Sequence, residues 1–549
     1  MRRNGIGRLL LSVGLLALTA LPAGGAAGEA AGLLGHVEMP NSGAETAQEP
    51  FLRGLLLLHS FEYEDAARAF RAAQQADPGF ALAYWGEALT HYHPVWLQLD
   101  AAAGRAALAR LAPTPAARQA RAASDRDRGY LAAVETLYAE GAAGEGAAAY
   151  ARAMADLSRR HPDDLEAAAL YAVSLFGTAA EGRDFRIYMQ AAAVAEEVFA
   201  ANPRHPGAAH YLIHAYDDPV HAPLGLRPAR VYAAIAPAAG HALHMPSHIF
   251  VALGMWEPAA ASNEASWAAG EARRERLGLS LEARNYHALY WLQYAYLQLG
   301  RWREARELLE RMAADAAASG SVRTRNHLAL MRGAWAVETG HWSGDLPAAP
   351  PTQGLSVEAR AVDLYLAGRQ ALAAGDQDAA AALAEQLSGL GAVASGGGAG
   401  YGGDAPAARQ AAAVMGLELA GLVAIEGGDA ATGLAQLRRA AQAEAAMPFD
   451  FGPPIPVEPA AELLGEMSLA HGEAAAALAA FGEARQRYPQ RWRSLAGAIR
   501  AGRAAGDAEA AAAAAHALRT AWRSADDGLA SPDLLAEPGA ATAEPGSGG

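Results

Sequence analysis

The sequence predicts an all-α protein in which antiparallel helical hairpins stack into a right-handed solenoid. Three observations lead to this prediction. Much of the hydrophobic content, 52% of 549 residues, is alanine, which favours helix because it has no side-chain entropy to lose. A pattern of small residues, aromatic residues and proline recurs along the chain. The chain is also too long for one compact core but suits an elongated repeat array.

The first 27 residues are typical of a signal peptide. Arg2, Arg3 and Arg8 precede an apolar run at 9–21, and small residues follow the run. The run is shorter than the roughly 20 residues that a membrane-spanning helix needs. We therefore predict an exported protein, periplasmic or extracellular, with no membrane span in the mature chain. The formal net charge of -15 argues against a nucleic-acid partner, which requires a basic surface.

The clearest repeat unit lies at residues 50–78. Small residues stand where two helices would cross, an aromatic residue follows four positions after the second of them, and proline ends the second helix. These positions are Gly54, Ala66, Phe70 and Pro78, and the same spacing returns with Gly465, Ala477, Phe481 and Pro489. Both units resemble the 34-residue tetratricopeptide repeat. Because one hairpin cannot bury its apolar face alone, neighbouring hairpins are expected to stack around a concave face.

Partial units with a Gly-x-Trp turn lie between these two repeats, at 254–256, 300–302 and 340–342. We expect an N-terminal array over 45–390, a glycine-rich loop at 391–404, C-terminal repeats over 405–525 and a disordered tail at 526–549. Residues 99–128 look like an irregular connection. The proline-rich segment 447–459 cannot be helical, because proline interrupts the backbone hydrogen bonds of a helix.

Histidines concentrate in one part of the chain. Seven of the 17 histidines fall between residues 205 and 248, and the chain has no cysteine. Without thiolates, a transition metal would have to be held by histidine, methionine or carboxylate. Neutral imidazole is a common ligand of zinc, copper and iron, so the concentration suggests a metal site.

The spacing of these histidines places them on two helical stripes. His210 and His214 are four residues apart, while His241, His244 and His248 step by three and four. In the repeat frame, these positions of the first helix face the concave groove. We predict that these five histidines bind a transition metal. Further candidates that would complete or orient the site are His221, Asp217 and His287, and Asp218 and Glu264 are additional acceptors for ring N–H groups.

The same frame places other residues on the groove surface: His59, Trp85, His93, Tyr290, Tyr294 and His327. A groove of this kind could instead bind a peptide or protein without metal, and the segment 447–459 of the chain itself could occupy it. On that alternative the histidines supply hydrogen bonds and pH sensitivity.

The sequence leaves the reaction open. A three-histidine metal site with a free position can activate water, and a redox metal can handle oxygen chemistry. The run from His210 to His214 is not a zinc-protease helix, because Tyr211 stands where the general-base glutamate would be. No phosphate-binding loop or dinucleotide motif appears, so no nucleotide cofactor is expected. Whether the protein is an enzyme is undetermined at this level.

Three segments together resemble a bacterial group of exported tetratricopeptide-repeat proteins. They are HYLIHAYDDPVH at 210–221, HALHMPSHIF at 241–250 and the proline-rich FGPPIPVEP at 451–459. The resemblance covers most of residues 50–520. It implies the repeat fold and a recurring histidine cluster, and it implies no particular reaction.

Overall fold

The computed structural model describes residues 32–139, 145–179, 183–342, 344, 346–392, 406–449 and 451–529. The predicted signal peptide at 1–27 lies outside this part of the chain, as do most of the predicted glycine-rich loop and most of the predicted tail.

Helices account for most of the described residues, which confirms the all-α class. The first group comprises α2 (Glu45–His59), α3 (Tyr63–Ala76), α4 (Ala81–Leu89), α5 (Ala101–Leu111), α6 (Pro115–Gln119), α7 (Asp125–Leu137), α8 (Gly146–Arg160), α9 (Leu165–Phe176), α10 (Phe185–Ala201), α11 (Pro206–Tyr216) and α12 (Ala222–Ile235). The middle group comprises α13 (Gly240–His244), α14 (Pro246–Ala252), α15 (Trp256–Leu277), α16 (Tyr286–Gln298), α17 (Trp302–Ser319) and α18 (Val322–Thr339). The last group comprises α19 (Val357–Ala373), α20 (Gln377–Ala392), α21 (Pro406–Glu426), α22 (Ala430–Ala446), α23 (Ala460–Ala470), α24 (Ala474–Arg487), α25 (Trp492–Ala505) and α26 (Ala508–Ala521). In the described part of the chain, the strands are β1 (Tyr92–His93) and β2 (Gln98–Leu99), which pair antiparallel.

Consecutive helices pack as hairpins, and the small residues of the repeat frame lie where the helices cross. A Cβ atom added to Gly54 would come within 2.8 Å of the Phe70 ring, and one added to Gly465 within 3.0 Å of the Phe481 ring. A side chain at either position would therefore force the two helices of the hairpin apart. The repeat units predicted at both ends of the array are confirmed by this packing.

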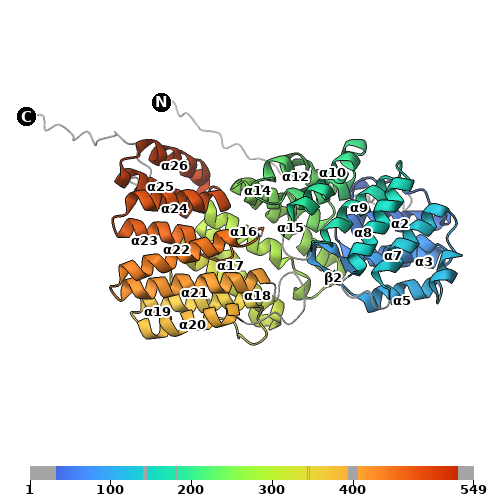
Figure 1. Cartoon of the computed structure of the whole chain (residues 1–549). Helices are drawn as coiled ribbons and strands as arrows, with labels where there is room; N and C mark the ends of the chain where they lie inside the picture. Colours follow the sequence, from blue (N-terminus) through green and yellow to red (C-terminus); the bar gives the residue numbers. More distant parts are fainter. Residues whose placement is uncertain are drawn as a thin grey trace, which may run out of the picture.

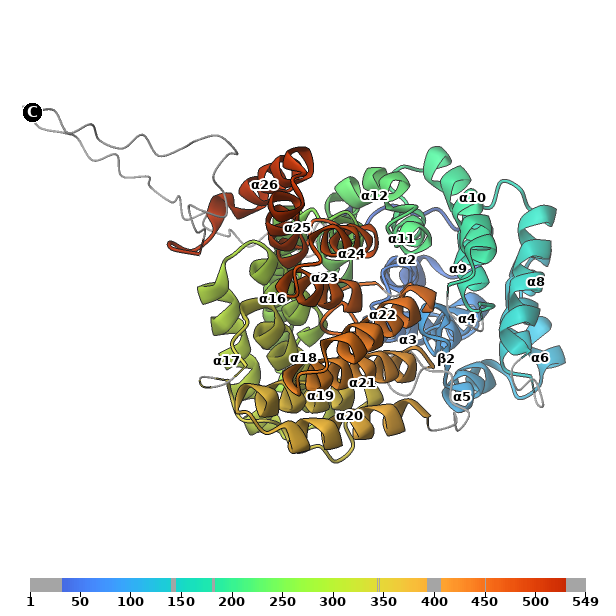
Figure 2. The ribbon, with the colours of Figure 1, turned by 60° about the vertical axis from the view of Figure 1, so that its left-hand side comes forward.

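The hairpins form two lobes joined by the middle helices. Figure 1 shows α2–α12 on one side of the molecule and α19–α26 on the other, with α14–α18 between them. Figure 2 shows α23–α25 lying beside α16. The indole N–H of Trp256 donates to the carbonyl of Gln490 (2.9 Å), and that of Trp522 donates to the carbonyl of Gln298 (3.0 Å). The last repeats therefore pack against the middle of the chain, and the array folds back on itself.

Two boundaries differ from those predicted. Residues 99–128 are not an irregular connection, because α5, α6 and the start of α7 lie there. Each of these helices begins at a side-chain cap, provided by Asp100, Thr114 and Ser124. Such caps satisfy the free N–H groups of a first helical turn and compensate for a weak apolar pattern.

The ends of the predicted loop and tail also shift. Helix α20 continues to Ala392, two residues into the predicted loop. The side chain of Asp526 accepts hydrogen bonds from Arg303, so the start of the predicted tail is held on α17. The proline-rich segment lacks helix in its described residues, as predicted.

Helix α21 is long and apolar enough to cross a membrane by length and composition, and half of its most apolar window is buried inside the protein. It packs between α20 and α22 and carries the buried Glu418. In this fold α21 is a core helix of the second lobe.

Candidate metal centre

The histidine segments lie on helices that meet between the two lobes. Helix α11 carries His210 and His214. Its start is fixed by Pro206 in the first turn and by the ring of His205, whose Nδ1 accepts a hydrogen bond from the backbone N–H of Ala208 at 3.1 Å. Helices α13 and α14 run nearly continuously through Met245, and Pro246 opens the second of them. They present His241, His244 and His248 toward α11.

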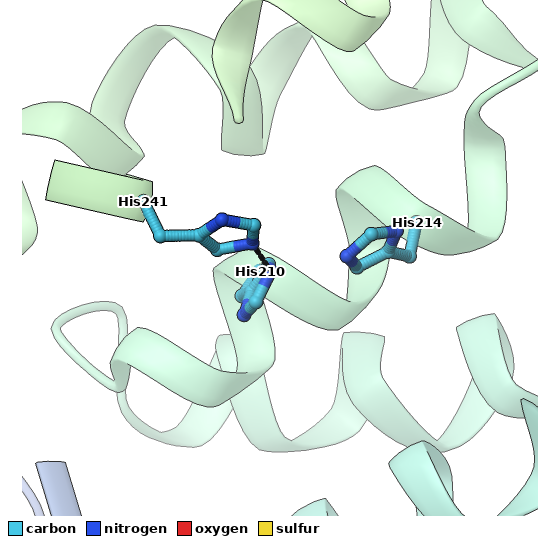
Figure 3. A group of neighbouring side chains, drawn as sticks. All are labelled: His210, His214 and His241. Atoms are coloured by element: carbon cyan, nitrogen blue, oxygen red, sulfur yellow. Dashed lines mark hydrogen bonds between the residues drawn. The ribbon is translucent and has the colours of Figure 1, made fainter. Parts of the chain in front are cut away.

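The structure divides these histidines into two groups of three. His210, His214 and His241 form the first group, here called triad A (Figure 3). His244, His248 and His287 form the second group, triad B, to which α16 contributes His287. In each triad the candidate ligand atoms lie within 4.8 Å of one another.

This spacing suits a first-row metal ion. Three atoms that are all within 4.8 Å of each other share a point no more than about 2.8 Å from each, compared with the 2.0–2.1 Å of a zinc–imidazole bond. Two pairs are closer still. The Nε2 atoms of His210 and His241 are 3.2 Å apart, and those of His244 and His248 are 3.1 Å apart. Tetrahedral ligands at this bond length lie about 3.3 Å apart.

Neighbouring acceptors fix the tautomers of triad B. Nδ1 of His248 donates to a carboxylate oxygen of Asp217 (2.5 Å), and Nδ1 of His244 donates to the amide oxygen of Asn263 (2.7 Å). The amide nitrogen of Asn263 donates in turn to the carbonyl of Ala259, which fixes the orientation of the amide. When both rings are neutral, these acceptors hold the protons on Nδ1, and two Nε2 lone pairs face each other at 3.1 Å. A cation between the two nitrogens removes this repulsion.

Triad A is oriented in a similar way. Nδ1 of His210 donates to the backbone carbonyl of His59 at 2.7 Å, so its Nε2 faces the triad as a lone pair. Nε2 of His214 is buried and has no hydrogen-bond partner among the described residues. Metal-bound histidines usually have their second ring nitrogen held by an acceptor of this kind.

Burial keeps most of these rings neutral. It lowers the pKa of His210, His214, His241 and His287 well below the ordinary value for histidine, and neighbouring imidazoles lower it further. Burial and the proximity of His248 also lower the pKa of His244 to about 3. Neutral imidazole is the form that binds metal.

Aromatic rings lie against both triads. The ring of Phe61 lies 4.2 Å from that of His210 and 5.7 Å from that of His241, measured between centroids. Phe61 adopts a left-handed backbone conformation (φ 56°), which is uncommon for a bulky residue and is often found at functional sites. In triad B, the ring of Trp291 lies 4.4 Å from that of His248.

The proline-rich segment reaches triad B. The ring of Phe451 lies 4.9 Å from that of His248. Gly452 has a φ of +104°, and a Cβ there would come within 2.5 Å of the Trp291 ring. Only glycine permits this close approach. The segment thus occupies part of the concave side, as the sequence suggested it could.

His59, Glu166 and His205 form a third buried group, whose ring nitrogens all have hydrogen-bond partners within the protein. His205 donates from Nε2 to Glu166 (3.1 Å), and the ring nitrogens of His59 lie 2.7 Å from Glu166 and 2.8 Å from the hydroxyl of Tyr211. Every ring nitrogen of this group has a partner. Its arrangement is that of a structural cluster, which positions the carbonyl of His59 for triad A.

The other predicted orienting residues have varied surroundings. Asp217 contacts triad B, as described, and His287 belongs to that triad. His221 lies outside both triads, where its Nδ1 is 2.9 Å from Asp218. Glu264 instead accepts a hydrogen bond from the hydroxyl of Tyr296 at 2.7 Å.

Four of the residues that the sequence placed on the groove surface, His59, Trp85, Tyr290 and Tyr294, are buried in the structure. Trp85 packs against Tyr130, while Tyr294 accepts a hydrogen bond from Arg491 of the last repeats. The last repeats therefore cover Tyr294, whereas Trp85 is covered within the first lobe. His93 stacks on Tyr63 with ring centroids 3.9 Å apart. His327 is half-buried on α18, with its ring centroid 5.8 Å from that of Tyr286.

Phe61, Trp291 and Asn263 are contributors that the sequence interpretation missed. Each lies in a loop or on a helix away from the histidine stripes. The Asn263 amide has no distinguishing motif, but Trp291 follows His287 by four residues and so lies on the same helical face.

Comparisons with known proteins show helical repeats at low similarity. No family model matches the sequence, and no curated protein matches it. Among solved structures, the human IFIT1 dimer with PPP-AAAA is 13% identical, with 91% of this chain and 96% of that chain covered and a TM-score of 0.34. The TPR domain of P58(IPK) is 13% identical, with 84% and 99% covered and a TM-score of 0.24. Yeast Tom70 is 10% identical, with 85% and 90% covered and a TM-score of 0.31. At these values the fold assignment rests on the hairpins of this chain itself.

Proposed function

We propose that this protein binds transition-metal ions in its two histidine triads. The observation that carries the proposal is the pair of facing Nε2 atoms of His244 and His248, 3.1 Å apart, in rings whose Nδ1 atoms each lie beside a hydrogen-bond acceptor. A buried pair of lone pairs without a cation is unfavourable, since a buried polar group costs about 1–3 kcal/mol when it lacks a partner.

The ligand set favours zinc, copper or iron. Each triad offers three neutral imidazoles, and no carboxylate belongs to either group. Magnesium and calcium prefer oxygen ligands, whereas imidazole suits these borderline metals. Each triad leaves at least one coordination position for an external ligand, which is the arrangement of catalytic rather than structural metal sites.

Export belongs to the same proposal. The predicted signal peptide would deliver the chain to the periplasm or the exterior, and histidine-only ligation is compatible with an oxidising compartment because it has no thiol to oxidise. Measuring where the full-length chain accumulates after cell fractionation tests this part independently.

Peptide binding in the concave groove is the alternative function. It has less support, because several predicted groove residues are buried and Phe451 of the chain itself lies against His248. A peptide would have to displace the proline-rich segment.

Elemental analysis of protein purified without an affinity tag tests the proposal. We expect about two transition-metal ions per chain, about one for His244→Ala, and no change for His471→Ala, whose ring lies on the surface at the end of α23. Circular dichroism checks that each variant folds. A metal content near zero after growth in metal-supplemented medium, unchanged by His244→Ala, contradicts the proposal and favours the peptide-binding alternative.

A further inference from the structure

We propose that the two triads form one dinuclear copper centre, which binds dioxygen between its two ions. This inference rests on the proposed metal binding and adds the identity of the metal, the coupling of the two ions and the class of the external ligand.

The triads adjoin each other directly. Across their boundary, the ring centroids of His214 and His248 are 5.9 Å apart, and those of His241 and His244 are 6.2 Å apart. These ring separations leave no room for another side chain between the two pairs. His241 and His244 lie one turn apart on α13, yet they belong to different triads. From this adjacency we infer that ions held by the two triads are close enough for one small ligand to span them, as in two-metal sites with ions about 3.5–4 Å apart.

The charge of the site favours monovalent copper in the resting state. The six ligands are neutral, and two carboxylates lie beside them: Asp217 binds His248, and Glu62 accepts a hydrogen bond from the backbone N–H of His241 at 3.1 Å. Two divalent ions would place four positive charges in a buried site against at most two negative ones, which is costly in a low dielectric. Two Cu⁺ ions carry two positive charges. Imidazole is a ligand that suits copper, and a d¹⁰ Cu⁺ ion has no geometric preference against three ligands.

Dioxygen is the external ligand that keeps this charge constant. Each Cu⁺ ion gives up one electron and becomes Cu²⁺, while dioxygen accepts both electrons and becomes peroxide, O₂²⁻, bound between the ions. No proton is taken up and no bond other than the O–O π bond is broken. Four positive charges from the two Cu²⁺ ions and two negative charges from peroxide leave the same net charge of two as in the reduced pair. The surrounding protein therefore need not reorganise its charges when the ligand binds.

The aromatic rings beside the centre suit a small apolar ligand. Phe61 covers triad A, and Trp291 and Phe451 cover triad B. His241 and His287 are the more accessible members of their triads. Apolar rings on both sides of the centre favour a small apolar ligand such as dioxygen over a charged one.

The test loads the full chain with Cu⁺, supplied anaerobically as its acetonitrile complex, and then admits air. We expect about two coppers per chain and, after air, almost no electron paramagnetic resonance signal, because the two Cu²⁺ ions are coupled through the bridging peroxide. A strong near-ultraviolet absorption band should appear with oxygen. A Cu⁺-specific chelator should then detect no remaining reduced copper.

The matched variants are His287→Ala and His471→Ala. The first removes the more accessible ligand of triad B, and we expect it to abolish the oxygen-dependent band and to leave a signal of about one spin per chain. The second removes an exposed histidine at the end of α23, outside the triads, and should behave as the parent protein. A signal of about two spins per chain in the parent protein overturns the dinuclear inference while leaving metal binding intact. Absence of bound copper, with zinc present instead, also overturns it, and absence of any metal overturns the proposed function as well.

Discussion

The centre between the lobes and the second lobe bury polar groups in opposite ways. The centre contains the six imidazoles of triads A and B, whose inward nitrogens face one another. The second lobe contains an arginine–glutamate network, formed by Arg369, Arg491, Arg493, Glu338, Glu458, Glu462 and Glu466. In the network, guanidinium donors face carboxylate acceptors, three arginines against four glutamates. In the triads, neutral imidazoles bring acceptor nitrogens face to face. The difference supports the proposal that a bound cation completes the triads, whereas the network stabilises the fold without one.

Arg491 shows how the network works. Its guanidinium is fully buried and binds both carboxylate oxygens of Glu462 at 2.9 Å. It also contacts Glu338 and donates to the hydroxyl of Tyr294 at 2.8 Å. One side chain thus ties the start of α25 to α16, α18 and α23. Burial disfavours the charged form, but the surrounding carboxylates raise the pKa of Arg491 and keep it ionised.

Replacing Arg491 should have the largest effect. Arg491→Ala leaves Glu462 and Glu338 buried without their cation, and we expect a loss of about 3–5 kcal/mol in the free energy of unfolding. Denaturant unfolding measures this loss. Arg500→Ala, on the exposed side of the same helix, should change stability by less than about 0.5 kcal/mol. If the folded fraction of Arg491→Ala also loses its metal, the two polar clusters are not separate in function.

Replacing Asp217 should have an intermediate effect, limited to metal binding. Asp217→Asn keeps an acceptor for Nδ1 of His248 but removes the negative charge. Loss of such a partner typically weakens metal affinity by about 10–100-fold, or about 1.4–2.7 kcal/mol. Competition titration with a chelator measures the dissociation constant.

Glu264→Gln provides the matched control, since the carboxylate of Glu264 binds Tyr296 and contacts neither triad through a hydrogen bond. Its affinity should equal that of the parent protein. Equal affinity in Asp217→Asn would mean that the carboxylate serves the fold of α11 rather than the metal centre.

The sequence predicted the fold better than it predicted the site. Repeat positions such as Gly54 and Phe70 are local, and their spacing alone determines how a hairpin packs. The histidine stripes were also visible, because residues three or four apart on a helix share a face. Their division into two triads was not, because it depends on the offset between α11 and α13, which are joined through α12. The burial of Tyr294 was equally hidden, since Arg491, its partner, lies 197 residues away in the chain.

The smallest expected effect concerns Glu418, a buried carboxyl of the second lobe that lies outside the arginine–glutamate network. Neither of its carboxylate oxygens has a hydrogen-bond partner among the described residues. Burial raises the pKa of Glu418 well above its ordinary value, and the nearby Glu444 and Glu458 raise it further. A carboxyl whose pKa is raised on folding favours the folded state fully at pH values below its unfolded pKa. That contribution is lost as the pH rises through the folded pKa, because the folded state then holds an unfavourable buried charge.

Replacing Glu418 with an apolar residue of similar volume should therefore stabilise the protein at neutral pH and above. We expect Glu418→Met to raise the free energy of unfolding by about 1–2 kcal/mol near pH 7.5, since each unit of pKa shift corresponds to about 1.4 kcal/mol. The gain should shrink toward zero as the pH falls to about 4.5. Urea unfolding at a series of pH values measures it, and Glu426→Met, at the exposed end of the same helix, should show no such pH dependence. A loss of stability in Glu418→Met that is constant with pH would instead mean that Glu418 belongs to the arginine–glutamate network. The whole second lobe would then differ from the triads in the same way, because its buried polar groups would all be paired within the protein.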